Sequence, residues 1–218
     1  MLFITGCPQS GQTILATHLK RFGLNTSPGA KPENDYLDPV VQSINNDILK
    51  LSRCSWCDVP NTVDIFSNGA IEYRISVFLN KHPEIQFLKD PRFTFTFPTW
   101  KPFFSDPDFL ITFREPGETA RSLHSKFGLC IVEGLNLWRS YYSRIAHFKA
   151  AFVEFGSDVE FEDYIENLDR AFRFLELDVP ASPISEIWRD DKLNSRSTGS
   201  IPVPIKKLYH LLQHRTEN

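Results

Sequence analysis

The chain has 218 residues, of which 41% are hydrophobic and 23% are charged, and its formal net charge is −3. This composition excludes a wholly disordered chain, and no apolar stretch reaches the roughly 18 residues of a membrane span. A slightly acidic chain without a basic cluster is not expected to have nucleic acid as a partner. We therefore predict a single domain over residues 1–218. Because no basic region precedes a long apolar run, a cytoplasmic location is expected.

The first two dozen residues predict a buried strand, a tight turn and a helix. The strand is the apolar run Leu2–Thr5, and apolar residues at helical spacing begin at Ile14. Between them, Gly6 and Gly11 free the backbone of Cβ atoms where it must curl, so successive N–H groups can point inward. The helix N-terminus adds unpaired N–H donors and a partial positive charge. The turn is therefore predicted to bind a phosphate or another tetrahedral anion.

Beyond a surface loop over Gly23–Pro39, the chain alternates helices with short strands. The predicted elements are helices over Val40–Leu51, Ala70–Asn80, Thr119–Phe127, Cys130–Phe155, Asp163–Leu177 and Pro204–Gln213, and strands over Ile85–Leu88, Phe93–Pro98, Asp108–Phe113 and Val159–Phe161. This alternation implies an α/β fold with three layers, α/β/α, around a central, mainly parallel sheet.

The glycine spacing is that of a phosphate-binding loop of the form G-x-x-x-x-G-K-[ST], as in P-loop NTPase-like folds. Gln12 stands where that motif has its lysine, and Thr13 stands at the Ser/Thr position. A P-loop kinase or NTPase would need the lysine and usually an acidic partner for magnesium. This class stays open as an alternative, and magnesium-dependent ATP binding would favour it.

Polar residues follow three of the predicted strands, and ligands of open α/β sheets bind beyond the C-terminal ends of the strands. The first strand delivers the anion loop, the second delivers Lys89–Arg92, and the third delivers Arg114. Ser122 lies about two turns into the helix after Arg114, so a guanidinium and a hydroxyl can reach one crevice and bind a second phosphate. The pattern indicates a nucleotide with phosphates at both ends.

Three segments of the chain resemble motifs of the sulfotransferase family, whose donor is 3′-phosphoadenosine 5′-phosphosulfate (PAPS), and they follow one another in the family's order. The segments are Ile4–Leu15, similar to the 5′-phosphosulfate loop; Phe113–Leu123, similar to the 3′-phosphate motif; and Leu88–Arg92 (L-K-D-P-R), similar to an element common in bacterial members. Weaker similarities lie at Leu137–Tyr142 and Phe161–Tyr164, and Arg196–Gly199 loosely resembles a segment that some members fold over the 3′-phosphate. The resemblance implies sulfuryl transfer to an acceptor hydroxyl or amine, with 3′-phosphoadenosine 5′-phosphate (PAP) as product.

The resemblance also implies which residues bind PAPS. These donor-binding residues are Gly6, Pro8, Gln9, Ser10, Gly11, Gln12, Thr13, Ile14, Arg114 and Ser122. Loop N–H groups up to Ile14, with the hydroxyls of Ser10 and Thr13, would hold the 5′ end, and Arg114 and Ser122 would hold the 3′-phosphate. No metal is expected, because backbone donors and side-chain cations would take that role.

Residue 9 departs from the family pattern, because the loop usually has Lys or Arg where this chain has Gln9. That cation would act on the oxygen between sulfate and phosphate as the S–O bond breaks, so its loss costs rate more than binding. Lys89 is expected to supply the charge instead. The predicted catalytic residues are Gln9, Lys89 and Asp90, with Asp90, Glu115 and His124 as alternatives for the general base. A non-catalytic relic that binds PAPS or PAP is the alternative that explains Gln9 most simply.

The acceptor is left open as a small molecule, a carbohydrate or a lipid. Its specificity is expected to lie in Gly23–Pro39, in Ser52–Asn68 and in the aromatic run Phe93–Phe104. Cys54 and Cys57 form a C-x-x-C that could be half a zinc site or a redox pair. Because no second pair or histidine cluster completes it, reduced thiols are the favoured interpretation.

Overall fold

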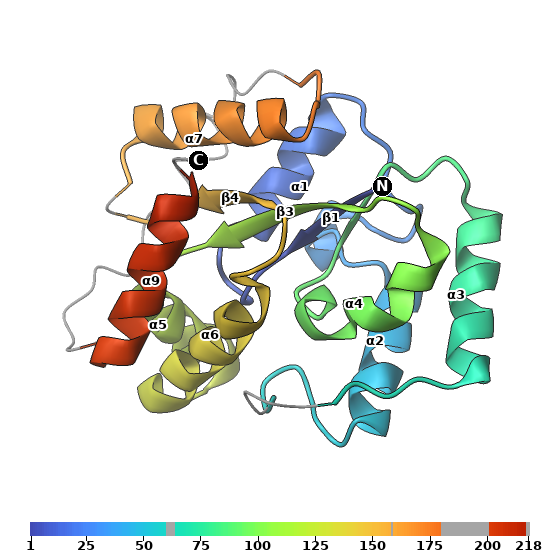
Figure 1. Cartoon of the computed structure of the whole chain (residues 1–218), viewed down its shortest axis with the longest axis horizontal. Helices are drawn as coiled ribbons and strands as arrows, with labels where there is room; N and C mark the ends of the chain where they lie inside the picture. The colour runs from blue at the N-terminus through green and yellow to red at the C-terminus, as the bar shows by residue number, and fades with distance from the viewer. Residues whose placement is uncertain (60–63, 158, 180–200, 217–218) are drawn as a thin grey trace.

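The computed structural model describes residues 1–59, 64–157, 159–179 and 201–216 (Figure 1). Its strands form one parallel sheet in the order β2-β1-β3-β4. The strands are β1 (Leu2–Thr5), β2 (Phe87–Lys89), β3 (Asp108–Phe113) and β4 (Ala151–Glu154). The two strands that precede the predicted anion loop and Arg114 therefore lie side by side in the centre, and β2 brings Lys89 beside Ile4 of β1.

Helices cover both faces of this sheet, as the alternation of elements predicted. They are α1 (Gln12–Arg21), α2 (Pro39–Leu51), α3 (Gly69–Lys81), α4 (Phe93–Trp100), α5 (Pro116–Phe127), α6 (Ile131–Ile145), α7 (Phe161–Phe174) and α9 (Val203–Thr216). Successive strand residues point to opposite faces. Ile4 packs in a cluster with α1 and α7, while Phe3 packs in a second cluster with α2 to α6 and α9. The α/β/α prediction is confirmed.

The predicted strand Phe93–Pro98 is wrong, because this segment is helix α4. The alternation of phenylalanine with threonine does not mark two faces here, since the first five residues of the helix are all buried. A helix buried on every side shows no polar stripe, so its period cannot be read from the sequence. Asn45 of α2 satisfies two of its interior polar groups, accepting hydrogen bonds from the Thr96 hydroxyl and the Trp100 indole N–H, both at 2.8 Å.

The long helix predicted over Cys130–Phe155 is also wrong: α6 ends at Ile145, and β4 follows. A residue far away in the sequence stabilises the end of α6. Arg215 of α9 donates to the carbonyl oxygens of Ala146 and Phe148, at 3.1 and 2.8 Å, where the chain leaves the helix. Nor is Val159–Phe161 a strand, because Phe161 begins α7. The other predicted elements form with small shifts of their ends.

Candidate anion-binding site

The loop between β1 and α1 has the backbone conformation that its glycines indicated. Gly6, Gln9 and Gly11 have φ angles of 139°, 70° and 91°. A Cβ atom on Gly6 would lie 2.3 Å from the carbonyl oxygen of Thr112 in β3, and one on Gly11 would lie 2.7 Å from the Phe155 ring. Both glycines are thus needed for backbone conformation and for space.

The front of this loop carries backbone donors without protein partners. Within the described part of the chain, the N–H groups of residues 9–13 make no hydrogen bond. The Ile14 N–H, in contrast, donates to the Gly11 carbonyl oxygen at 3.1 Å, and the Ile14 side chain is buried in the core. The expectation that Ile14 binds the donor is therefore not supported, and the available donors end at Thr13. Together with the N-terminus of α1, these groups can receive an anion.

Buried hydroxyl groups hold the rear of the loop. The Cys7 N–H donates to the Tyr142 hydroxyl oxygen at 3.1 Å, and that hydroxyl donates to the Thr112 carbonyl oxygen at 2.8 Å. The Ser10 hydroxyl donates to the Cys7 carbonyl oxygen at 2.6 Å and is buried. Ser10 was expected to offer its hydroxyl to the donor, but the structure turns this group away from the pocket. Burial raises the pKa of Tyr142, so this hydroxyl stays protonated and can donate.

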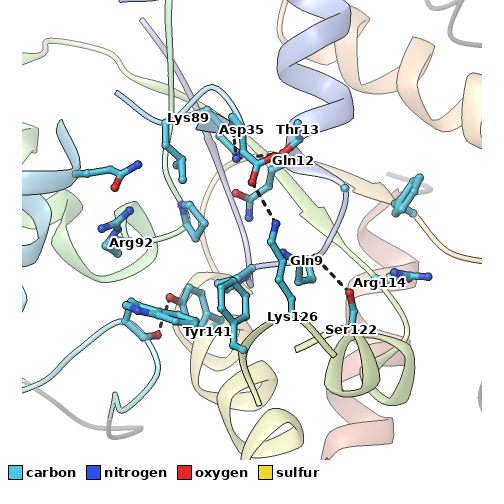
Figure 2. Close-up of a pocket in the computed structure, with 18 of the residues that line it drawn as sticks. Gln9, Gln12, Thr13, Asp35, Lys89, Arg92, Arg114, Ser122, Lys126 and Tyr141 are labelled. Carbon is cyan, nitrogen blue, oxygen red and sulfur yellow. Dashed lines mark hydrogen bonds and ion pairs between the residues drawn. The ribbon is translucent and has the colours of Figure 1, made fainter. Parts of the chain in front are cut away.

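A pocket of about 610 Å³ lies in front of the loop, within the range of small-ligand sites (Figure 2). The predicted site residues that line it are Pro8, Gln9, Gly11, Gln12, Thr13, Lys89, Arg114 and Ser122. Gly6, Ser10, Ile14 and Asp90 do not line it. Three separate segments of the sequence therefore meet at one cavity, at the carboxyl ends of β1, β2 and β3.

Lys89 brings a cation to the first turn of α1. Its side chain is 5% exposed, and its Nζ donates to the Asp35 carbonyl oxygen at 2.7 Å and to the Thr13 hydroxyl at 3.3 Å. Burial lowers the pKa of Lys89 from 10.5 to about 8, against the opposing effect of the Asp35 and Asp90 carboxylates. An arriving anion would favour the ammonium form. The ammonium thus lies beside α1, although residue 12 is uncharged.

Arg114 and Ser122 line another side of the same pocket. Arg114 is buried and donates from Nε to the Glu118 carboxylate at 2.7 Å, and its guanidinium carbon lies 5.6 Å from the centre of the Phe155 ring. These contacts fix the direction of the guanidinium. The Ser122 hydroxyl donates to Gln9 Oε1 at 3.2 Å, which links this helix to the anion loop.

None of the three general bases considered from the sequence lines this pocket. Asp90 is fully buried, accepting from the Arg92 backbone N–H and Nε at 2.9 and 2.8 Å, so it braces the chain after β2. Glu115 accepts from the Glu118 N–H at the start of α5, and His124 is exposed and bonds through Nδ1 to the Leu129 carbonyl oxygen. Their contacts are structural.

Asp35 is the one carboxylate among the described residues that line the pocket, and sequence reasoning missed it. It lies in a loop of Gly, Pro, Asn and Asp with no motif around it. Its φ of 55° is left-handed, a conformation that Asp adopts more readily than most residues. Its carboxylate is 3.2 Å from Lys126 Nζ, and its carbonyl oxygen accepts from Lys89. One residue thus contacts two cations of the pocket.

Tyr141 lies on the side of the pocket away from α1 (Figure 2), and Trp56 and Phe127 also line the pocket. The rings of Trp56 and Phe127 meet edge to face with centroids 4.9 Å apart. Tyr141 donates its hydroxyl to the Trp56 carbonyl oxygen at 3.0 Å. Trp56 belongs to the segment Ser52–Asn68, in which acceptor specificity was expected, whereas the rings of the run 93–104 are mostly in the core.

Cys7, Cys54, Cys57 and Cys130 form no disulfide. Among the residues that the structure describes, no group of three or more His, Cys, Asp or Glu side chains is placed to hold a metal ion. No helix in those parts of the chain is long and apolar enough to cross a bilayer. The segment Arg196–Gly199 lies outside the described residues.

A scan of protein-family models and a search of curated proteins found no match. Among solved structures, the chain is similar to the sulfotransferase domain of the olefin synthase from Synechococcus PCC 7002. The similarity covers 96% of this chain and 93% of that domain, with a TM-score of 0.55 and 12% sequence identity. The chain has a sulfotransferase fold. This confirms the fold that the three motifs implied, and at such low identity the comparison concerns the fold alone.

Proposed function

We propose that this pocket binds PAPS and that the protein transfers its sulfuryl group to an acceptor hydroxyl or amine. The observation that carries the proposal is the meeting of two anion-binding places in one cavity. The unpaired N–H groups of residues 9–13, with Lys89, form the first, and Arg114 with Ser122 forms the second. A sulfotransferase fold supports this use of the cavity. Titration with PAP tests the proposal: micromolar binding supports it, and no binding at millimolar PAP overturns it.

Lys89 would carry the electrostatic part of the transfer. The acceptor oxygen or nitrogen attacks sulfur as the bond from sulfur to the bridging phosphate oxygen breaks, and PAP leaves with the bonding electrons. Negative charge then grows on the 5′-phosphate, close to the N–H groups of the loop and the buried ammonium of Lys89. Donors fixed in place before the reaction stabilise such charge most effectively. Gln9 adds a neutral donor at most, so we expect slow turnover.

Asp35 would take the proton that the acceptor loses. Asp35 lines the pocket, with its carboxylate 3.2 Å from Lys126 Nζ and its carbonyl oxygen bound by Lys89, whereas Asp90, Glu115 and His124 do not line it. The acceptor would enter past Trp56 and Phe127, whose contacting rings line the pocket. A small molecule with an apolar part beside its hydroxyl or amine fits these surroundings.

Replacing Asp35 by asparagine is expected to lower kcat about a hundredfold, the usual contribution of a positioned base. PAP binding should stay the same or become tighter, because a negative charge leaves the cavity. The measurement is release of PAP from PAPS in the presence of a panel of alcohols, amines, sugars and hydroxylated lipids. The exposed Asp106→Asn variant serves as the matched control and should behave as the wild type. Unchanged turnover in Asp35→Asn would exclude Asp35 as the base.

A PAP-binding protein without catalysis is the second candidate, because both Gln9 and Gln12 are uncharged where related loops carry cations. The Gln9→Arg variant separates the two. An enzyme whose base is in place should gain turnover when the cation returns, whereas a relic without a working base should stay inactive.

A further inference from the structure

Gln12 occupies the position of the phosphate-loop lysine, yet its amide turns back into the loop. The side chain is 4% exposed, and its Nε2 donates to the carbonyl oxygens of Gly6 and Cys7 at 2.8 and 3.2 Å. Because carbonyl oxygens only accept, the NH₂ group must be the end that faces them. Gln12 Oε1 is buried and has no hydrogen-bond partner among the described residues. The side chain thus connects the helix end of the loop to its strand end.

These bonds complete the set that holds the loop from behind. The Cys7 N–H is bound by Tyr142, and the Cys7 carbonyl oxygen also accepts from the Ser10 hydroxyl. With the Gly6 and Cys7 carbonyls engaged by Gln12, neither peptide group can rotate to present its oxygen to the pocket without losing hydrogen bonds. These two carbonyl oxygens are thus kept from an anion, which can meet the N–H groups of residues 9–13, the arrangement that binds negative charge.

The positive charge comes from elsewhere in the sequence. Lys89 enters from the end of β2 and places its ammonium 3.3 Å from the hydroxyl of Thr13, the residue after Gln12. A lysine at position 12 could in principle both brace the loop and carry the charge. We propose that this chain divides those two tasks, with Gln12 as the positioning residue that keeps the loop open to an anion and Lys89 as the cation. This inference rests on the proposed 5′-phosphosulfate site.

The division predicts that a lysine at position 12 can replace both residues. We would measure the affinities for PAP and for adenosine 3′-phosphate, which lacks the 5′-phosphate. In Gln12→Met, of similar size but without a donor, PAP affinity should fall about tenfold while adenosine 3′-phosphate binds as before. Gln12→Lys can still donate to both carbonyls and should bind PAP at least as well as the wild type. In a Lys89→Met background, Gln12→Lys should restore PAP affinity at least tenfold.

The matched control is Gln86→Met, the same chemical change at an exposed position outside the pocket, which should alter neither affinity. Thermal unfolding of each variant separates loss of binding from loss of fold, and Gln12→Lys remains informative if Gln12→Met does not fold. The inference would be overturned, with the proposed function left standing, if Gln12→Met kept the wild-type ratio of PAP affinity to adenosine 3′-phosphate affinity. It would also be overturned if Gln12→Lys restored no PAP affinity in the Lys89→Met background. A wild-type protein that fails to bind PAP would overturn the proposed function together with it.

Discussion

Replacing Lys89 by methionine is expected to weaken PAP binding about thirtyfold and to slow sulfuryl transfer at least a further hundredfold. A hydrogen bond to a charged group contributes about 2 kcal/mol to binding, and a donor placed where charge develops contributes more in the transition state. Lys89 is only 5% exposed, so little water can take the place of the missing ammonium. Calorimetry measures the first effect and PAP release from PAPS the second, with the exposed Lys50→Met as matched control.

The pH dependence gives the same residue an independent signature. Because burial lowers the pKa of Lys89 to about 8, the amine is mostly protonated below that pH and loses its proton above it. A bound anion prefers the ammonium, so PAP affinity should be constant from about pH 7 towards 8 and then fall by up to tenfold per pH unit. The Lys89→Met variant should show no such fall. Equal profiles for the two proteins would contradict a role for this ammonium in binding.

Gly6→Ala is expected to destabilise the protein by about 3 kcal/mol or more, the size of effect seen when a special backbone position is lost. The added Cβ would lie 2.3 Å from the Thr112 carbonyl oxygen, a backbone atom of the neighbouring strand that cannot turn aside. The φ of 139° adds strain for any residue with a side chain. For a chain of this size, the melting temperature should fall by roughly 6–12 °C in a thermal unfolding experiment.

Gly69→Ala is the control for this variant. Gly69 opens α3, and a Cβ there would meet no heavy atom within 4 Å. Alanine also restricts the unfolded chain more than glycine does, so this change should be neutral or slightly stabilising. Equal melting temperatures for Gly6→Ala and the wild type would show that β1 and β3 separate at little cost, contrary to the close approach that the structure describes.

The parts of the fold that the sequence predicted correctly, and the predicted residues that line the pocket, are those with a local signal. The apolar run Asp108–Phe113 became β3 with the same ends, and two glycines at fixed spacing located the loop. Lys89, Arg114 and the loop all follow the carboxyl ends of parallel strands, which is where ligands of such sheets bind, and they line one cavity.

The parts that the sequence did not predict depend on partners far along the chain. The end of α6 is held by Arg215 from far along the chain, so no local signal marks it. The first five residues of α4 are all buried, so its helical period cannot be read. The hydrogen bond between Cys7 and Tyr142 joins residues 135 positions apart in the sequence, and no local motif predicts it. Asp35 reaches the pocket from an irregular loop, where a single aspartate carries no pattern.

The pocket is proposed to hold a nucleotide with phosphates at both ends. Calorimetric titration with PAP, compared with ADP as the nucleotide without a 3′-phosphate, tests this proposal most directly. We expect micromolar PAP binding and at least a tenfold loss with ADP, about 1.4 kcal/mol or more, with much of that preference lost in Ser122→Ala. Equal affinities for the two nucleotides, above all if both required magnesium, would show that the pocket has no 3′-phosphate site and would favour a P-loop kinase or NTPase.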